Sequence, residues 1–238
     1  MSERPIIFSA PMIRALLDGR KTQTRRVLKP QPKPHATFFA YDFGNNGFFA
    51  RWLEEDEQGH ADLPFARIPA MKGDRLWVRE AHYLTDDGDS GYAVFAEDAN
   101  GVSDHLENIQ TLMNTFPKVD WSKHARLRPS IHMPRWASRL TLIVTDVRVQ
   151  RLQEISEADA RAEGAKAGDW PDRPHCSCDD DDCAACSHYP ALHIPAFKRL
   201  WDTMHGPAAW DANPWVAALT FTVHKRNIRQ MEPTNDQR

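Results

Sequence analysis

The apolar residues of this chain occur in short runs of two different periods, and that pattern limits its fold more than any other feature. Residues 140–149 place apolar side chains on alternate positions, as a strand with one buried face does. Residues 12–18 carry apolar side chains at helical spacing and stop at Gly19, a residue suited to a helix end. Because short strands and helices follow one another without a βαβ rhythm, we expect an α+β fold built on a small mixed sheet or barrel.

Other segments extend this mixed pattern. Residues 6–8, 75–80, 92–96 and 216–223 are predicted strands. Residues 195–204 are a predicted helix whose apolar stripe, from Phe197 to Met204, packs into the core. Residues 34–70, in contrast, are expected to form an irregular excursion that aromatic side chains anchor.

The strand at residues 140–149 contains a change of parity. Its first apolar residues fall on even positions, and the two valines that end it fall on odd positions. A shift of one residue turns every later side chain to the other face of a sheet. We therefore expect a bulge or a sharp bend at Thr145 and Asp146.

The composition excludes several classes of protein. Of the 238 residues, 41% are hydrophobic and 10% are aromatic, which excludes a wholly disordered chain. No run approaches the roughly 18 to 20 uninterrupted apolar residues of a membrane-spanning helix. Residues 1–5 lack the apolar run of a secretory signal, so we expect a cytoplasmic protein.

The formal net charge of −3 conceals a segregation of charges along the chain. Residues 1–35 carry eight basic residues against two acids, and residues 122–151 carry seven against one. Residues 154–183 carry ten acids against three bases. The two basic segments, brought together, would form a positive face for a phosphate-bearing partner such as RNA or DNA. The alternative is that they are solvated surfaces paired with the acidic segment.

All four cysteines occur within eleven residues, at Cys176, Cys178, Cys183 and Cys186. In a cytoplasmic chain, clustered thiols favour a metal over disulfides. The spacing C-x-C-x4-C-x2-C allows four thiolates to surround one tetrahedral zinc ion. Such a site is closed, so it would hold a loop and would not activate water. The alternative is a reduced loop without metal.

Lys21 and Thr24 lie three positions apart, directly after the predicted helix end, with Arg20, Arg25 and Arg26 beside them. Nearby positive charge disfavours a protonated lysine, so Lys21 is a candidate base or nucleophile with a lowered pKa. A threonine hydroxyl becomes nucleophilic only when a neighbouring base takes its proton, and Lys21 is suited to that task. The alternative is a basic turn that binds phosphate, with Thr24 as a hydrogen-bond donor.

Residues 19–26, Gly-Arg-Lys-Thr-Gln-Thr-Arg-Arg, resemble the G-x-K-T-x-T-x-R signature of the ASCH family (activating-signal-cointegrator homology domains). The similarity continues through residues 73–80, the strand at residues 140–149 and residues 160–164, and it ends at residues 213–216. These segments span nearly the whole chain, and the first of them is the most specific. The chain looks like the larger ASCH-domain proteins that are common in phages and prophages.

The resemblance implies a PUA-like fold, which is a small, partly open mixed β-barrel with short helices, related to RNA-binding domains. It also implies a single domain over residues 1–238 with large insertions at about residues 34–70, 84–125 and 166–190. The last insertion contains the four cysteines, so a structural zinc ion would hold that loop. If a phage encodes the chain, its expected compartment is the host cytoplasm.

Small members of the family hydrolyse the acyl amide of N4-acetylcytidine with a lysine, a threonine and a glutamate. The resemblance places these roles on Lys21, Thr24 and Glu163, with Glu157 as the nearby alternative carboxylate. Lys21 would deprotonate Thr24, Thr24 would attack the acyl carbon, and Glu163 would protonate the leaving amine. This chemistry requires no cofactor.

Further residues are predicted to contact the substrate. Arg25 or Arg26 would stabilise the oxyanion or hold a phosphate. Trp77 would stack on the base, with burial in the core as the alternative. Glu80 is a second candidate carboxylate, and its alternative role is a salt bridge with the neighbours of Arg79 or with Arg26.

Three functions remain open on these grounds. The first is hydrolysis of an acylated pyrimidine, either as a modified cytidine nucleoside or within RNA or DNA. The second is a non-catalytic PUA-like module that binds RNA or DNA through the basic face. The third is a nuclease that uses the same pocket, and none of the three involves a membrane.

Overall fold

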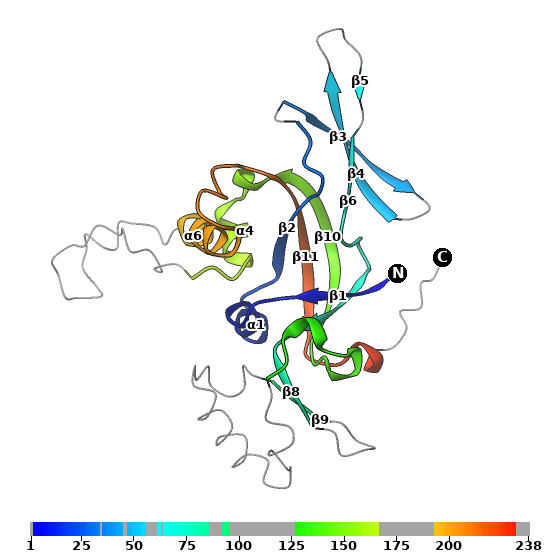
Figure 1. The fold of residues 1–238 in the computed structure, drawn as a ribbon, viewed down its shortest axis with the longest axis vertical. Helices are drawn as coiled ribbons and strands as arrows, with labels where there is room; N and C mark the ends of the chain where they lie inside the picture. Colours follow the sequence, from blue (N-terminus) through cyan, green and yellow to red (C-terminus); the bar gives the residue numbers. More distant parts are fainter. Residues whose placement is uncertain are drawn as a thin grey trace, which may run out of the picture. The chain divides into compact units, whose positions relative to one another are not determined.

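The computed structural model describes residues 2–33, 35–44, 47–55, 61–62, 64–85, 92–95, 127–166 and 193–231. The fold within these residues is mixed α+β, with extensive strands and few, short helices (Figure 1). The chain divides into two compact units. The first consists of Met1–Gly19, Gly73–Val144 and Thr222–Arg238, and the second consists of Arg20–Lys72 and Thr145–Phe221.

A five-stranded sheet has the order β1-β7-β10-β11-β2. Its strands are β1 (Glu3–Ile7), β7 (Arg75–Arg79), β10 (Thr141–Arg151), β11 (Trp215–His224) and β2 (Gln23–Val27). β1 and β7 are parallel, whereas β10 is antiparallel to β7 and β11 is antiparallel to β2. β1 and β2 are the edge strands, so the sheet formed by the described residues is open. The expected α+β class is confirmed, but the strands do not close into a barrel.

The first unit contains the helix that precedes the signature. α1 (Ala10–Leu17) begins slightly earlier than predicted and has Pro11 in its first turn, where the missing N–H breaks no hydrogen bond. Met12 and Ile13 are buried on its inner face. Gly19 follows the helix with a φ of 73°, a left-handed conformation that favours glycine. The predicted helix and its end are therefore confirmed.

The first unit also contains a β-hairpin and several 3-10 helices. β8 (His82–Thr85) pairs antiparallel with β9 (Tyr92–Phe95), which confirms the strand predicted there. The 3-10 helices are η1 (Ser130–His132), η2 (Arg135–Ala137) and η4 (Ile228–Gln230).

The second unit contains a small sheet where the sequence predicts an irregular excursion, so that prediction is wrong. The sheet consists of β3 (Thr37–Gly44), β4 (Gly47–Glu55), β5 (Ala61–Asp62) and β6 (Phe65–Arg67). Aromatic pairs across the strands stabilise it, since the Phe43 and Phe48 rings stack with their centroids 4.8 Å apart. A register shift between Phe38 and Ala40 breaks the alternation that would have revealed β3 in the sequence.

β10 changes character between its two halves. Leu142 and Val144 are buried, whereas Thr145 and Asp146 are both exposed. Two consecutive exposed residues interrupt the alternation at the position where the sequence changes parity. The bulge or bend expected there stays a prediction.

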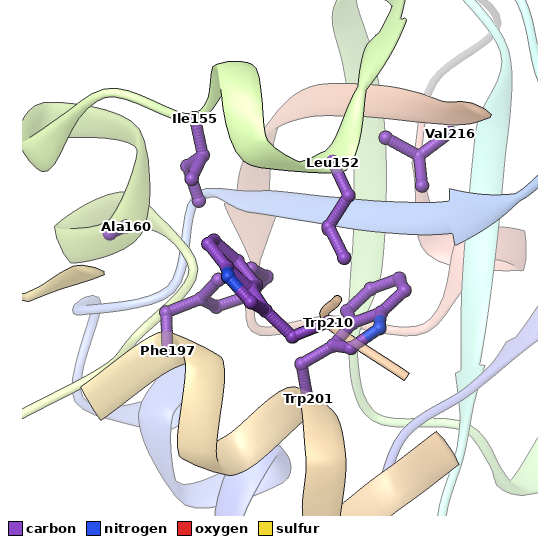
Figure 2. Close-up of a cluster of buried hydrophobic side chains, with 7 residues drawn as sticks. All are labelled: Leu152, Ile155, Ala160, Phe197, Trp201, Trp210 and Val216. Carbon is purple, nitrogen blue, oxygen red and sulfur yellow. The ribbon is translucent and has the colours of Figure 1, made fainter. Parts of the chain in front are cut away.

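The apolar core of the second unit surrounds α6 (Ile194–His205) (Figure 2). Its buried members are Leu152, Ile155, Ala160, Phe197, Trp201, Trp210 and Val216. Figure 2 shows Phe197 and Trp201 projecting from α6 toward Ile155 and Leu152. Ala160 belongs to α4 (Glu157–Ala162), so this cluster packs α4 against α6. This packing positions Glu163, a candidate site residue, because Glu163 is the C-cap of α4.

α6 matches the predicted helix in position but not in every contact. Phe197 and Trp201 are buried as expected. Met204, in contrast, is 47% exposed. The last residue of α6 that belongs to the apolar cluster is Trp201, one turn before the helix ends at His205. No helix among the described residues is long and apolar enough to cross a membrane.

Candidate active site

Backbone hydrogen bonds hold the signature segment between the end of α4 and β11. Lys21 forms an isolated antiparallel bridge with Glu163. The N–H of Thr22 donates to the carbonyl of Ala162 at 2.8 Å, and the carbonyl of Thr22 accepts from Phe221 N–H at 2.9 Å. These bonds fix Lys21 beside the C-terminal end of α4, although the two segments are far apart along the chain.

The Lys21 side chain contacts Glu163 directly. Its Nζ donates to the Glu163 Oε2 at 2.7 Å and to the Glu163 backbone carbonyl at 2.9 Å. Lys21 is 2% exposed and Glu163 is 3% exposed. The structure therefore brings together two of the three residues to which the sequence assigns catalytic roles.

Arg25 binds the other oxygen of the same carboxylate. Its Nη1 donates to Glu163 Oε1 at 3.1 Å, and its Nη2 donates to Asp159 Oδ2 at 3.1 Å. Gln23 accepts a further bond from Arg25 Nη1 at 2.6 Å and donates its Nε2 to Asp159 Oδ1 at 3.1 Å. One guanidinium thus spans two carboxylates of α4 and its C-cap.

Asp159 connects this buried group to the surface. Arg148 Nη2 donates to both Asp159 carboxylate oxygens, at 3.0 and 3.1 Å. Burial by itself would raise the pKa of Asp159. Hydrogen bonds from Arg148 and Gln23 and the charges of Arg25 and Arg148 outweigh burial and lower that pKa. Asp159 therefore stays a carboxylate that accepts hydrogen bonds on both oxygens.

Burial and charge act on Lys21 in opposite directions. Burial lowers its pKa because the ammonium loses hydration. The negative charge and hydrogen bond of Glu163 raise the pKa, and the positive charges of Arg26 and Arg25 lower it. The balance is a pKa below that of an ordinary lysine. A neutral amine, which can act as a base, is therefore formed at lower pH than usual.

Thr24 and Arg26 occupy the other positions of the signature in β2. Thr24 is buried and pairs with Leu219, and Arg26 pairs with Ala217. Thr24 takes part in none of the hydrogen bonds that join Lys21, Arg25 and Glu163. Burial lowers the pKa of Arg26, and the charge of Glu163 opposes that effect. Arg26 therefore lies within the electrostatic field of Glu163.

The structure distinguishes Glu163 from the alternative carboxylate, Glu157. The Glu157 carboxylate accepts hydrogen bonds from the backbone N–H of His193 at 2.6 Å and of Ile194 at 3.3 Å. Glu157 thus caps the N-terminal end of α6, a structural role that suits an acidic side chain. Glu163, and not Glu157, contacts Lys21.

The remaining residues predicted to contact substrate belong to the first unit. Trp77 is buried, and the guanidinium carbon of Arg79 lies 4.6 Å from the centre of its ring. Glu80 forms a bidentate ion pair with Arg139, with distances of 3.0 and 2.9 Å. Trp77 is thus buried as its alternative role predicts, and Glu80 is salt-bridged, but its partner is Arg139 and not Arg26. Glu80 also lines a cavity of about 180 Å³ beside Ser9 and Ser130.

Sequence reasoning missed three residues of the site: Gln23, Asp159 and Arg148. The spacing of residues in the sequence could have revealed Gln23 and Asp159. Gln23 lies between Lys21 and Arg25 at strand spacing, which puts it on the same face as Arg25. Asp159 lies four positions before Glu163, which puts both carboxylates on one side of a helical segment.

The four cysteines, Cys176, Cys178, Cys183 and Cys186, lie outside the described residues. The zinc site therefore stays a prediction. Among the residues that the structure does describe, no group of three or more His, Cys, Asp or Glu side chains could hold a metal ion.

Comparisons with protein-family models, with curated proteins and with solved structures found no match to this chain. The resemblance to the ASCH signature stays an expectation drawn from the residues themselves. The chemistry that this site can perform must therefore be derived from the contacts among Lys21, Arg25 and Glu163.

Proposed function

We propose that this chain is an ASCH-type amidohydrolase that removes an acyl group from the exocyclic amine of a modified pyrimidine. The substrate is an N4-acetylcytidine-like nucleoside, or the same base within RNA or DNA. One observation carries the proposal: Lys21 Nζ lies 2.7 Å from the Glu163 carboxylate across 142 positions of sequence. A buried amine and carboxylate at hydrogen-bond distance can pass a proton, as amide hydrolysis requires.

The first half of the reaction transfers the acyl group to Thr24. As in the hydrolases that the signature resembles, neutral Lys21 takes the proton of the Thr24 hydroxyl, and the oxygen attacks the acyl carbon to form a C–O bond. Lys21 passes its proton to Glu163, and Glu163 delivers it to the exocyclic nitrogen as the C–N bond breaks. The products of this half are an acyl ester of Thr24 and the free cytosine amine.

The second half regenerates the enzyme. Water attacks the ester carbon while Lys21 takes the water proton. The C–O bond to Thr24 breaks, the Thr24 oxygen recovers a proton from Lys21, and a carboxylic acid leaves. Arg26 is assigned to the oxyanion or to a substrate phosphate, because Arg25 already contacts Glu163, Asp159 and Gln23.

We further infer that the open five-stranded sheet is the core of a PUA-like fold. Support comes from the mixed parallel and antiparallel pairing and from the signature strand β2 at one edge of the sheet. The small sheet of β3 to β6 then corresponds to the first of the expected insertions.

A screen of N4-acylated cytosines, cytidines and modified oligonucleotides with purified protein tests the proposed activity. Lys21→Ala and Thr24→Ala should each abolish deacylation while the circular dichroism spectrum stays that of the folded protein. Lys198→Ala is the matched control, because Lys198 is an exposed lysine paired with Asp211. Full activity in both site variants would refute the assignment.

The second candidate is a non-catalytic module that binds RNA or DNA. Exposed aromatic side chains of β3 favour it, because Phe43 is 69% exposed and Phe39 is 59% exposed, and bases stack on such rings. Salt dependence separates the two functions. A nucleic-acid binder loses affinity steeply as salt is added, whereas turnover of a neutral nucleoside does not.

A further inference from the structure

The guanidinium of Arg25 joins two carboxylates that come from one short helical segment. Asp159 lies in α4, and Glu163 is the residue that ends it. Arg25 gives one terminal nitrogen to each of them at 3.1 Å. Its side chain has no exposed surface in these ion pairs, and that of Glu163 is 4% exposed.

We propose that Arg25 is a positioning residue: it holds the Glu163 carboxylate in the orientation in which Glu163 faces Lys21, and Asp159 and Gln23 hold Arg25 in turn. This inference rests on the proposed function, in which Glu163 exchanges a proton with Lys21. It assigns a role to a position that the G-x-K-T-x-T-x-R signature leaves open, since the signature arginine is Arg26.

The geometry supports this role for three reasons. Glu163 presents one oxygen to Lys21 and the other to Arg25, so rotation of the carboxylate would break both contacts. The planar fork of arginine presents fixed N–H directions, which a lysine cannot do. Gln23 contacts both Arg25 and Asp159, and therefore fixes the fork from the strand side.

The same group also sets the charge around Lys21. Lys21 faces Glu163 on α4 and the positive charges of Arg25 and Arg26 on β2, with Asp159 and Arg148 further along the network. Arg25 lowers the pKa of Lys21. Loss of the Arg25 charge by itself would raise that pKa, but a displaced Glu163 removes the larger contributions that raise it. A positioning role for Arg25 therefore predicts a net fall in the Lys21 pKa and an acid limb of the activity profile at lower pH.

The test compares Arg25→Met, Arg25→Lys and a control, Arg161→Met, which removes an exposed arginine of the same helix. The assay is hydrolysis of N4-acetylcytidine as a function of pH. We expect Arg25→Met to lower kcat roughly 10²-fold with little change in KM, as misplacement of a reacting group does, and to shift the acid limb to lower pH. Arg25→Lys keeps the charge but loses the fork, so kcat should remain reduced and the acid limb should again lie at lower pH. Arg161→Met should match the wild type.

A second measurement is independent of catalysis. NMR titration of the Lys21 Nζ, without substrate, should give a lower pKa in Arg25→Met than in the wild-type protein. If the wild type hydrolyses no acylated cytosine, the proposed function fails, but this titration still decides the role of Arg25. A Lys21 pKa that is unchanged or raised in Arg25→Met would show that Glu163 keeps its place without Arg25, and would overturn the inference. If Arg25→Met does not fold, Asp159→Asn replaces it in the test, because this variant weakens the ion pair that holds Arg25. Asp159→Asn should then lower kcat. A wild-type kcat in Asp159→Asn would overturn the inference.

Discussion

Lys21 is almost fully buried, and its neighbours determine its proton affinity. Burial lowers its pKa, Glu163 raises it, and Arg26 and Arg25 lower it. The net effect of these contributions is a lowered pKa, so Lys21 is neutral at a lower pH than an exposed lysine would be. A base that must take a proton from a hydroxyl benefits from that shift, because the active form is present at lower pH.

The pKa of Lys21 predicts the pH dependence of both activity and stability. Activity should rise with pH as Lys21 loses its proton, centred below the ordinary lysine value of 10.5. Between the folded and unfolded pKa values the unfolded chain binds more protons at this residue, so the free energy of unfolding should increase with pH there. Rate profiles and urea unfolding at several pH values measure these effects. A rise in activity centred at the ordinary value would contradict the prediction.

Two glutamates close together in the sequence form a matched pair. Glu163→Gln should reduce kcat by about 10²-fold or more, because the carboxylate that exchanges the proton is lost. Glu157→Gln should retain activity but lower stability by about 1 kcal/mol, because it weakens the cap of α6. Deacylation assays and thermal unfolding of both variants check the prediction. Equal loss of activity in the two variants would show that the fold, and not the proton transfer, is affected.

At the scale of an element, α4 is short and depends on its ends. Ser156 Oγ accepts a hydrogen bond from the backbone N–H of Asp159 at 3.1 Å at its N-terminus. At its C-terminus, Glu163 bridges to the signature segment. The cap thus helps to place both carboxylates that Arg25 joins.

Ser156→Ala should lower stability by about 1 kcal/mol, because it removes this N-cap. In a chain of this length that corresponds to a fall in Tm of about 2–4 °C. Ser156→Asp, which keeps an acceptor at the cap, should show a much smaller change. Thermal unfolding followed by circular dichroism measures both, and an unchanged Tm in Ser156→Ala would contradict the assigned cap.

The small sheet of β3 to β6 offers a second comparison between matched aromatic residues. Trp52 is buried, and its ring centre lies 5.8 Å from that of Trp215. Trp52→Ala should therefore cost about 3–5 kcal/mol of stability. Phe43→Ala, at an exposed ring that stacks on Phe48, should cost only about 0.5–1 kcal/mol. Urea unfolding of the two variants measures the difference, and similar losses would show that Phe43 is buried in solution.

At the scale of the whole molecule, the cysteine segment predicts roughly one zinc ion per chain. Elemental analysis of protein purified without chelator measures it, and metal-free protein would reject the site. A chelator should release the metal without abolishing deacylation, because four thiolates leave no open coordination position for catalysis. Loss of activity on chelation would contradict a purely structural role.

Local patterns in the sequence predicted many of the elements. The helix that ends at Gly19 and the strands β7, β9, β10 and β11 follow from apolar spacing over a few residues. β3 and β4 were missed because their aromatic residues occur as adjacent pairs, and because the register shift at Phe38 hides the period of two. An irregular strand is stabilised by its partner, which short-range spacing does not describe.

The sequence by itself determined the short mixed elements, the signature with Lys21 and Thr24, and Glu163 as the favoured carboxylate. Only the tertiary structure decided that Glu163 contacts Lys21 whereas Glu157 caps α6, and that Arg25 joins Glu163 to Asp159. The physical reason is that local periodicity reflects the conformation of neighbouring residues. A contact across 142 positions depends instead on how α4 packs against α6 and the signature strand, and that packing is a property of the folded chain.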